Sequence, residues 1–343
     1  MTGAQLRWDD RLYGGAWVAQ GREAVLWALQ AETLSADRTA GWVRKAGAKR
    51  GEPSALRAAL AQAFIFLDGP SHLQLRSEVA GRFSPHEVLA KRTLLLGWAD
   101  DLAESLPRTG ALDLVEHFAR ELPLQVMQGW LGLSVPSNEA LWRASRSLAL
   151  FLELPSLHSA VAREAEAALD WMAGSLRLAR PLASEDVQRL MLFFAGLETT
   201  RHLLSVCLWR ALSSPACWAG LTDDEAAQGL VHEVLRSHPP IRITGRRVRR
   251  SHLAFGRKLR RGDLVLADLG SADLPFGAGP HVCLGAALTR TETVMGLLAL
   301  RRARPQLRLA QPVGEADWLQ GPLYQGLTQL WAEDAPDGPP RSQ

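Results

Sequence analysis

The residues best suited to chemistry lie in the glycine-rich stretch 276–285, which reads Phe-Gly-Ala-Gly-Pro-His-Val-Cys-Leu-Gly and is here named the cysteine loop. A helical pattern follows it at once, so backbone amides at the helix start are expected to point toward the sulfur of Cys283. Amides and a helix N-terminus favour negative charge, which predicts a thiol pKa below the ordinary value of about 8.5. Such a thiolate is a metal ligand, and the alternative is a buried, inert cysteine.

A second unusual stretch lies inside a long apolar helix predicted over residues 185–211, whose middle reads Ala195-Gly196-Leu197-Glu198-Thr199-Thr200. Glycine costs up to about 1 kcal/mol in a helix interior and threonine is a mediocre helix former, so local propensity is broken here, as happens at functional sites. Gly196 would leave room for a bulky planar cofactor, and the Thr199 hydroxyl can bond either the helix backbone or a ligand. A kink stabilised by threonine is the alternative, more for Thr200 than for Thr199.

Two charged pairs have helical spacing. His72 and Arg76 are at positions i and i+4, and Glu233 and Arg236 are at i and i+3, so the members of each pair share one helix face. Two donors on one face can bind paired carboxylates, although a pair of this kind is more often a solvated surface. For Glu233 and Arg236 the alternative is a surface pair worth a few tenths of a kcal/mol.

The spacing Phe-x-x-Gly-x-His-x-Cys-x-Gly resembles the haem-thiolate loop of the cytochrome P450 family. Four signatures of that family occur in its order, and the resemblance spans roughly residues 14–331. It implies that Cys283 is the axial iron ligand and that Glu198 and Thr199 relay protons to iron-bound dioxygen. It also implies a buried structural pair, Glu233 with Arg236, beneath the haem. The cofactor-binding residues implied for haem b are His72, Arg76, Arg247 and His281 at the propionates, and Ala195, Gly196, Phe276, Gly277, Cys283 and Gly285.

The fold implied is mainly α, a helical bundle with small β-sheets around a buried haem. We expect one haem domain over residues 1–334, lacking the family's usual N-terminal leader helix, and a disordered tail over residues 335–343. Two more segments look deleted relative to the family, one before Ser184 and one over residues 268–274. The shortened second segment weakens any inference about redox-partner docking on that side.

The elements were predicted from periodicity and turn residues. A strand at 16–18 and a helix at 22–30 come first, and residues 37–67 should roof the substrate pocket, with Phe64 and Phe66 as pocket or ordinary core residues. Helices follow at 139–153, 159–178, 185–211 with Ser184 as N-cap, 223–237 and 286–300. Short strands are expected at 241–248 and 264–266, and a closing hairpin at 318–331 whose tip can reach the pocket.

Composition bounds the class of protein. The 343 residues are 47% hydrophobic with only three cysteines, an odd number that favours a reducing compartment, and no apolar signal region or run of about 18 apolar residues occurs. A cytoplasmic protein without membrane attachment is expected. The net charge of +3 reflects a local basic cluster, Arg246, Arg247, Arg249, Arg250, Arg257, Lys258, Arg260 and Arg261. A solvated hairpin face explains it best, a docking surface for an acidic partner second, and nucleic acid last, since no stacking aromatics are interleaved.

The family resemblance implies a haem-thiolate monooxygenase that hydroxylates or oxidatively couples a small-to-medium organic substrate, in bacterial specialised metabolism. It would use dioxygen and electrons from NAD(P)H through a ferredoxin-type or flavodoxin-type donor. The substrate can be a small molecule, a peptide or a carrier-bound intermediate; the apparent deletions favour a large or tethered one, while simple economy of chain length explains them equally. The alternatives are a peroxide-dependent haem-thiolate enzyme and a haem-binding, carrier-interacting scaffold without turnover.

Overall fold

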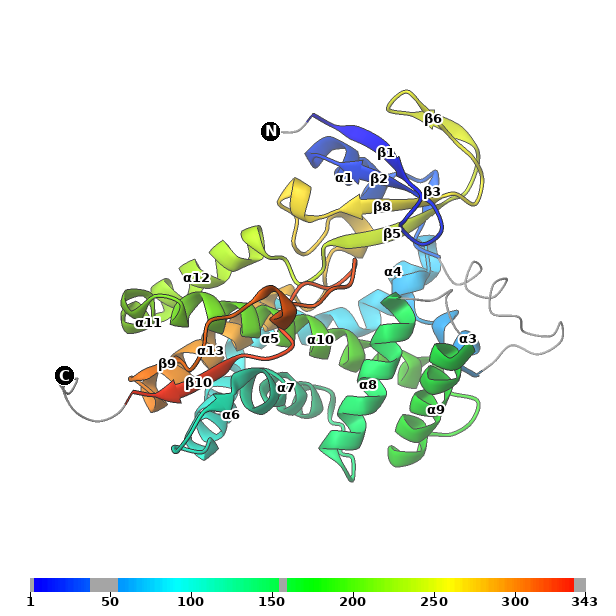
Figure 1. Ribbon diagram of the computed structural model, residues 1–343. Helices are drawn as coiled ribbons and strands as arrows, with labels where there is room; N and C mark the ends of the chain where they lie inside the picture. The colour runs from blue at the N-terminus through cyan, green and yellow to red at the C-terminus, as the bar shows by residue number, and fades with distance from the viewer. Residues whose placement is uncertain (1–2, 38–54, 154–158, 336–343) are drawn as a thin grey trace.

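The computed structural model describes residues 3–37, 55–153 and 159–335. Helices dominate: α1 Arg22–Gln30, α3 Ala55–Leu60, α4 Gly69–Ala80, α5 Pro85–Ala90, α6 Arg92–Ser105, α7 Glu121–Leu131, α8 Asn138–Glu153, α9 Ser159–Ser175, α10 Ser184–Leu212, α11 Pro215–Gly220, α12 Asp224–Ser237 and α13 Ala286–Ala303. The strands are β1 Gln5–Asp9, β2 Ala16–Gln20, β3 Leu34–Ser35, β4 Leu112–Asp113, β5 Ile243–Val248, β6 His252–Ala254, β7 Arg257–Leu259, β8 Leu264–Asp268, β9 Leu307–Leu309 and β10 Trp331–Asp334. The expected mainly α architecture with small sheets is confirmed (Figure 1).

The largest sheet has the order β1-β2-β8-β5-β3 and forms a lobe beside the helices (Figure 1). β2 and β8 run parallel, and the other pairs are antiparallel. Helix α1 covers this sheet with Ala24, Val25 and Ala28, which are buried. The helix has the predicted bounds, while β1 was missed. Pairing of Trp8 with Trp17 across β1 and β2 explains why a short strand at the sheet edge is stable.

Helix α10 runs through the centre of the helical lobe, where it contacts α7, α8, α12 and α13. Its side chains are buried on several faces, as expected for a helix enclosed by others rather than lying on a surface. The helix begins at Ser184, but its N-cap is Ala183 and no side chain caps it, so the predicted capping role of Ser184 is wrong. The central position of α10 brings its irregular middle, residues 195–200, to the interior.

Helix α13 follows the cysteine loop and packs mainly against α6, α12 and α10. Within the described residues, the stretch Gly279–Ala303 is long and apolar enough to cross a membrane by length and composition alone. Half of that window is buried inside the protein, and Leu297 and Leu300 are fully buried in the core. These contacts identify it as a core helix.

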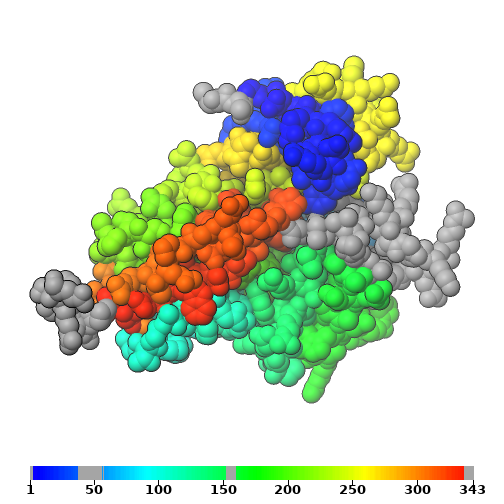
Figure 2. All heavy atoms as spheres, in the orientation of Figure 1, coloured from blue at the N-terminus to red at the C-terminus, as the bar shows by residue number. Residues whose placement is uncertain are grey.

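The chain after α13 returns across the molecule as an extended segment. Figure 2 shows this orange and red segment crossing the face of the helical lobe and reaching the β-sheet lobe at one end. β10 pairs with β4 and β9, and isolated bridges join Trp318 to Leu327 and Tyr324 to Ile241. Residues 323–327, named here the wall segment, therefore lie next to the start of β5. Ala335 is held by a hydrogen bond to the Gln306 carbonyl, and residues 336–343 of the predicted tail lie outside the described residues.

Candidate active site

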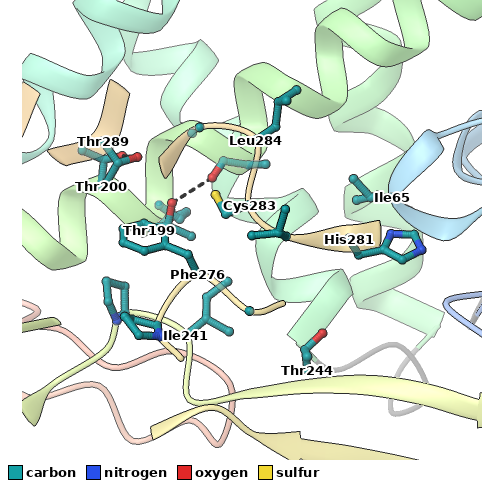
Figure 3. A pocket seen from close by; sticks show the side chains of 18 of the residues that line it. Ile65, Thr199, Thr200, Ile241, Thr244, Phe276, His281, Cys283, Leu284 and Thr289 are labelled. Carbon is teal, nitrogen blue, oxygen red and sulfur yellow. Dashed lines mark hydrogen bonds between the residues drawn. The ribbon is translucent and has the colours of Figure 1, made fainter. Parts of the chain in front are cut away.

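A cavity of about 330 Å³ opens between α10, α13, the cysteine loop, β5 and the wall segment. Most of its lining is apolar, including Phe64, Phe66 and Leu192, so the two phenylalanines predicted as pocket or core residues serve both purposes. Figure 3 shows Cys283 and Thr199 presented to this space from different elements. Of the predicted haem residues, the cavity is lined by Arg76, Ala195, Gly196, Phe276, Gly277, His281, Cys283 and Gly285, together with Glu198 and Thr199.

The cysteine loop is shaped by its glycines. Gly277 and Gly279 have φ values of 69° and 74°, a left-handed conformation that other residues rarely adopt, and a Cβ at Gly279 would lie 2.8 Å from Gln30. The Cys283 amide donates to the Phe276 carbonyl at 2.9 Å, which closes the loop. The Cys283 side chain is exposed to the cavity, whereas Cys207 is buried in α10.

The prediction of a lowered thiol pKa is wrong for the protein as described. Desolvation by the surrounding residues raises the pKa of Cys283, and it outweighs the Gly285 amide and the charges of Arg76 and Arg290, which lower it. The amide effect inferred from the sequence is present but smaller. A positive metal ion at the sulfur would reverse the balance, because a coordinating thiol is deprotonated.

Helix α4 holds the cysteine loop from behind. The buried His72 ring lies between two carbonyls, with Nδ1 2.8 Å from the Phe64 oxygen and Nε2 3.1 Å from the Pro280 oxygen. Arg76 donates from Nη2 to the Val282 carbonyl at 2.7 Å, and its other atoms line the cavity. His72 is thus a support of the loop outside the cavity lining, and Arg76 reaches the cavity itself.

His281 extends from the loop toward Asp68. Its Nε2 lies 3.7 Å from the Asp68 carboxylate, and its ring centroid lies 4.0 Å from that of His72, with the two rings tilted by 44°. Burial lowers the pKa of His281, helped by the charge of Arg246. Burial would raise the pKa of Asp68, but bonds from His281, Ser35 and Ala36 and the charge of Arg249 lower it well below its usual range.

The strand arginine that reaches the cavity is Arg246 and not the expected Arg247. Arg246 is only 7% exposed and lines the cavity, while Arg247 is outside the lining and donates to the Gly262 carbonyl at 3.0 Å. Successive side chains of a strand point to opposite faces, so a shift of one residue changes the side of the sheet. Arg249 pairs with Asp68 at 2.7 Å, and the rest of the basic cluster, Arg250, Arg257, Lys258, Arg260 and Arg261, is exposed on and beside the β6–β7 hairpin.

The middle of α10 faces the cavity through Ala195, Gly196 and Thr199. The Thr199 hydroxyl donates to the Ala195 carbonyl at 2.9 Å, while the Thr200 hydroxyl meets that of Thr289 at 3.3 Å (Figure 3). A Cβ at Gly196 would lie 2.6 Å from the sulfur of Met127. The glycine therefore makes room for a neighbouring helix at least as much as for a cofactor.

Glu198 lines the cavity but is tied into the helix interior. Its Oε2 accepts from Arg201 Nη2 at 3.0 Å and lies 3.3 Å from Nε2 of His202. Burial would raise the pKa of Glu198, but Arg201 and His202 together lower it to about 2. The carboxylate is ionised, and its proton-relay role stays a prediction.

Glu233 and Arg236 do not form the expected buried pair. Glu233 accepts from Arg210 at 2.7 Å, Arg236 lies 3.5 Å from Asp273, and the side chains of Glu233 and Arg236 are 51% and 61% exposed. Exposed ion pairs of this kind contribute little to the stability of the fold. Glu233 and Arg236 therefore pair with residues of other elements and not with each other.

Sequence reasoning missed several lining residues, among them Met127, Thr289 and Glu292. Glu292 is fully buried, burial raises its pKa well above the usual range, and its Oε1 has no partner among the described residues. The available signal was that Glu292 is the single acidic residue of α13 and precedes its apolar stretch. The predicted reach of the hairpin tip is confirmed, because Leu323 and Tyr324 line the cavity.

The residues present fit a haem. One thiol faces an apolar cavity, and no group of three potential metal ligands occurs elsewhere in the described part of the chain. Arg76 forms no ion pair with any described residue, and burial lowers its pKa, so a carboxylate brought beside it would be stabilised. Arg246 and His281 line the same cavity. A group with one iron and two carboxylates matches this donor set.

Comparison with known sequences agrees with the geometry. Cytochrome P450 107B1 of Saccharopolyspora erythraea is 27% identical over 310 residues, which cover 77% of this chain and 75% of that protein. Nocardicin C N-oxygenase of Nocardia uniformis subsp. tsuyamanensis is 29% identical over 320 residues, or 80% of this chain and 79% of that one. No family model matches the sequence.

Solved structures share the fold. CalO2 superposes with a TM-score of 0.80 at 24% identity and covers 94% of this chain and 91% of its own. P450BioI, solved in complex with an acyl carrier protein ligated to hexadec-9Z-enoic acid, gives 0.79 at 22% identity, with 93% and 92% covered. The curated relatives are monooxygenases, oxygenases and hydroxylases, which are oxidoreductases. With the cysteine loop and the cavity beside it, these likenesses place the chain in the cytochrome P450 family.

Proposed function

We propose that this protein is a haem-thiolate monooxygenase that hydroxylates or oxidatively couples a small-to-medium organic substrate in bacterial specialised metabolism. The observation that carries the proposal is the Cys283 thiol, exposed to a mainly apolar cavity whose wall also presents Thr199. The relative named for the oxidation of nocardicin C supports this class of substrate.

In the proposed site Cys283 holds the iron, and Arg76, Arg246 and His281 hold the haem carboxylates. Bound haem supplies dioxygen activation, favoured by electron donation from the thiolate. The chain's own contribution starts with His72, whose ring lies between the Pro280 carbonyl of the cysteine loop and the Phe64 carbonyl outside it, and so helps to hold the loop that carries the sulfur. The apolar lining excludes water from the substrate space.

Protons are the second task of the chain. The Thr199 hydroxyl, at the cavity surface, can exchange its bond to the Ala195 carbonyl for one to a bound ligand or water, because that bond is a local i to i−4 contact. Glu198, one residue earlier, is an ionised carboxylate at neutral pH and can accept and return protons. We assign the two residues the roles of proton donor and relay.

We propose further that electrons come from NAD(P)H through a ferredoxin-type or flavodoxin-type donor and that the protein works in the cytoplasm. Three free cysteines support a reducing compartment. The substrate is proposed to be small to medium in size and either a free molecule, a peptide or a carrier-bound intermediate. The neighbour solved with a loaded acyl carrier protein supports tethered delivery.

The test is the reduced carbon-monoxide complex. The purified protein should show the thiolate-type absorption band, and Cys283→Ala should abolish it, while Cys217→Ala, at a half-buried cysteine outside the cavity, should leave it unchanged. A band that persists in Cys283→Ala contradicts the ligand assignment. A band without product formation from any ligand that shifts the Soret absorption would favour a haem-binding scaffold instead.

A further inference from the structure

The wall segment touches two environments at once. Leu323 and Tyr324 line the cavity, and backbone bonds to the residues just before β5 hold them there, from the Arg242 amide to the Leu323 carbonyl and from the Gln325 amide to the Pro240 carbonyl, each at 2.9 Å. The same segment continues to Leu327, which is fully buried against α10. A displacement of the cavity wall therefore reaches the centre of the molecule.

Below the wall segment lies a buried polar cluster on α10. Glu198, Arg201 and His202 are at positions i, i+3 and i+4, which places them on one helix face, and none is more than 4% exposed. Arg201 donates to Glu198 Oε2 from Nη2 at 3.0 Å and from Nε at 3.3 Å, and the His202 Nε2 lies 3.3 Å from the same oxygen. Burial and the Arg201 charge lower the pKa of His202 to about 4, so Arg201 is the cation of the cluster.

The wall segment and the cluster share Arg201. Its Nη1 donates to the Leu327 carbonyl at 3.2 Å. The Leu327 amide donates to the hydroxyl of Ser205, also on α10, at 3.4 Å. The Tyr324 ring is 5.5 Å from the His202 ring. Gly326 is pressed against that imidazole, since a Cβ there would lie 2.3 Å from Nδ1.

This arrangement is stiff for electrostatic reasons. A buried guanidinium has to keep its acceptors, because removal of one partner of a buried ion pair leaves an uncompensated buried charge. The face of Trp142, 5.3 Å from the guanidinium, encloses it further. Arg201 cannot follow the wall without changing its bonds to Glu198, and Glu198 keeps one buried oxygen, Oε1, without a partner among the described residues.

We propose that Arg201 is a positioning residue that couples the cavity wall at residues 323–327 to the carboxylate of Glu198, so that the seating of the wall sets the orientation of that carboxylate. The consequence for catalysis rests on the proposed function, in which Glu198 relays protons. A ligand packed against Tyr324 would then change the orientation of the Glu198 carboxylate without contacting Glu198.

The first test asks whether Arg201 holds Glu198 ionised. Without this cation, burial of the carboxyl group is opposed only by a neutral imidazole, so Arg201→Gln should show a new infrared band of a protonated carboxylic acid at neutral pH. The band should disappear in the double variant Arg201→Gln, Glu198→Gln. Absence of the band in a folded Arg201→Gln protein overturns the proposal.

The second test moves the wall without changing any charge, and it serves where Arg201→Gln does not fold. Gly326→Ala forces a methyl group onto His202, whereas Gly314→Ala, where the new Cβ meets its nearest neighbour at 3.8 Å, is the matched control. The carboxylate band of Glu198 is isolated by subtracting the spectrum of each variant's Glu198→Gln partner. It should shift in Gly326→Ala and stay in place in Gly314→Ala.

An unshifted Glu198 band in Gly326→Ala overturns the coupling. Both measurements use the full-length protein and need neither substrate nor turnover. They can fail while the carbon-monoxide band is present, and they can succeed while it is absent, so a failure of this inference is distinguishable from a failure of the proposed function.

Discussion

Replacement of Thr199 by alanine separates a proton-handling residue from a structural one. The Thr199 side chain lines the cavity, and its hydroxyl donates a hydrogen bond to the Ala195 carbonyl of its own helix at 2.9 Å. The substitution removes this hydroxyl and one methyl group. No charged partner is lost.

The cost in stability is expected to be small. A hydrogen bond of this kind contributes about 0.5–1.5 kcal/mol net, and alanine is a better helix former than threonine by up to about 0.7 kcal/mol. The two effects oppose each other, so the free energy of unfolding should change by less than about 1 kcal/mol. Loss of a positioned proton donor, in contrast, lowers a rate by about 10²–10⁴-fold. Product formation should fall and hydrogen peroxide release should rise.

The assay measures product and peroxide per NAD(P)H oxidised, with a surrogate redox chain and a ligand chosen by its Soret shift. Thr199→Ser should restore much of the coupling because it restores the hydroxyl. Thr200→Ala is the matched control, since its hydroxyl meets Thr289 and not the Ala195 carbonyl. Unchanged coupling in Thr199→Ala, or uncoupling accompanied by a loss of stability above about 2 kcal/mol, would refute the reasoning.

Three more predictions follow from the site. Arg246→Gln should weaken haem retention by roughly tenfold or more, because a hydrogen bond to a charged group contributes about 1.5–3 kcal/mol, while Arg247→Gln should have little effect; transfer of haem to an apoprotein acceptor measures both. Asp68→Asn should destabilise the fold by about 1–2 kcal/mol at pH 7, and by progressively less as the pH falls below about 4, because a carboxyl group with a lowered pKa stabilises fully above its unfolded pKa and loses this effect as the pH falls toward its folded pKa; urea titrations at pH 7 and below pH 4 measure the difference. Glu292→Gln should stabilise the protein increasingly as the pH rises above about 4, because the raised pKa keeps a proton that the unfolded chain loses; a pH-independent effect in thermal unfolding would contradict this.

Features that depend on a short stretch of chain were predictable. The bounds of α1 and the existence of α10, α12 and α13 follow from periodicity, and the cysteine loop follows from residue types at fixed spacing. Its glycines have the left-handed backbone that such a loop needs. The gathering of residues from α4, α10, β5 and the loop around one cavity came from the family resemblance, and not from any local pattern.

Features that depend on which face of an element is buried were not predictable. Arg246 and Arg247 are the same residue type side by side, and the burial of both Gly245 and Arg246 breaks the alternation that would have chosen between them. The thiol pKa of Cys283 depends on desolvation by distant segments, which no local pattern contains. Glu233 and Arg236 have the right spacing to pair, but Arg210 and Asp273, from other elements, are their partners.

The four-residue spacing of His72 and Arg76 allows both side chains to contact the cysteine loop. On α4, a separation of four residues puts both side chains toward the cysteine loop, one turn apart. His72 reaches Pro280, three residues before Cys283, and Arg76 reaches Val282, immediately before it. Two donors on one rigid helix thus fix the two ends of a short segment that contains His281, whose side chain lines the cavity. Because Arg76 uses one nitrogen for the Val282 carbonyl and still lines the cavity, it can orient the loop and bind a carboxylate together, so its replacement would disturb both.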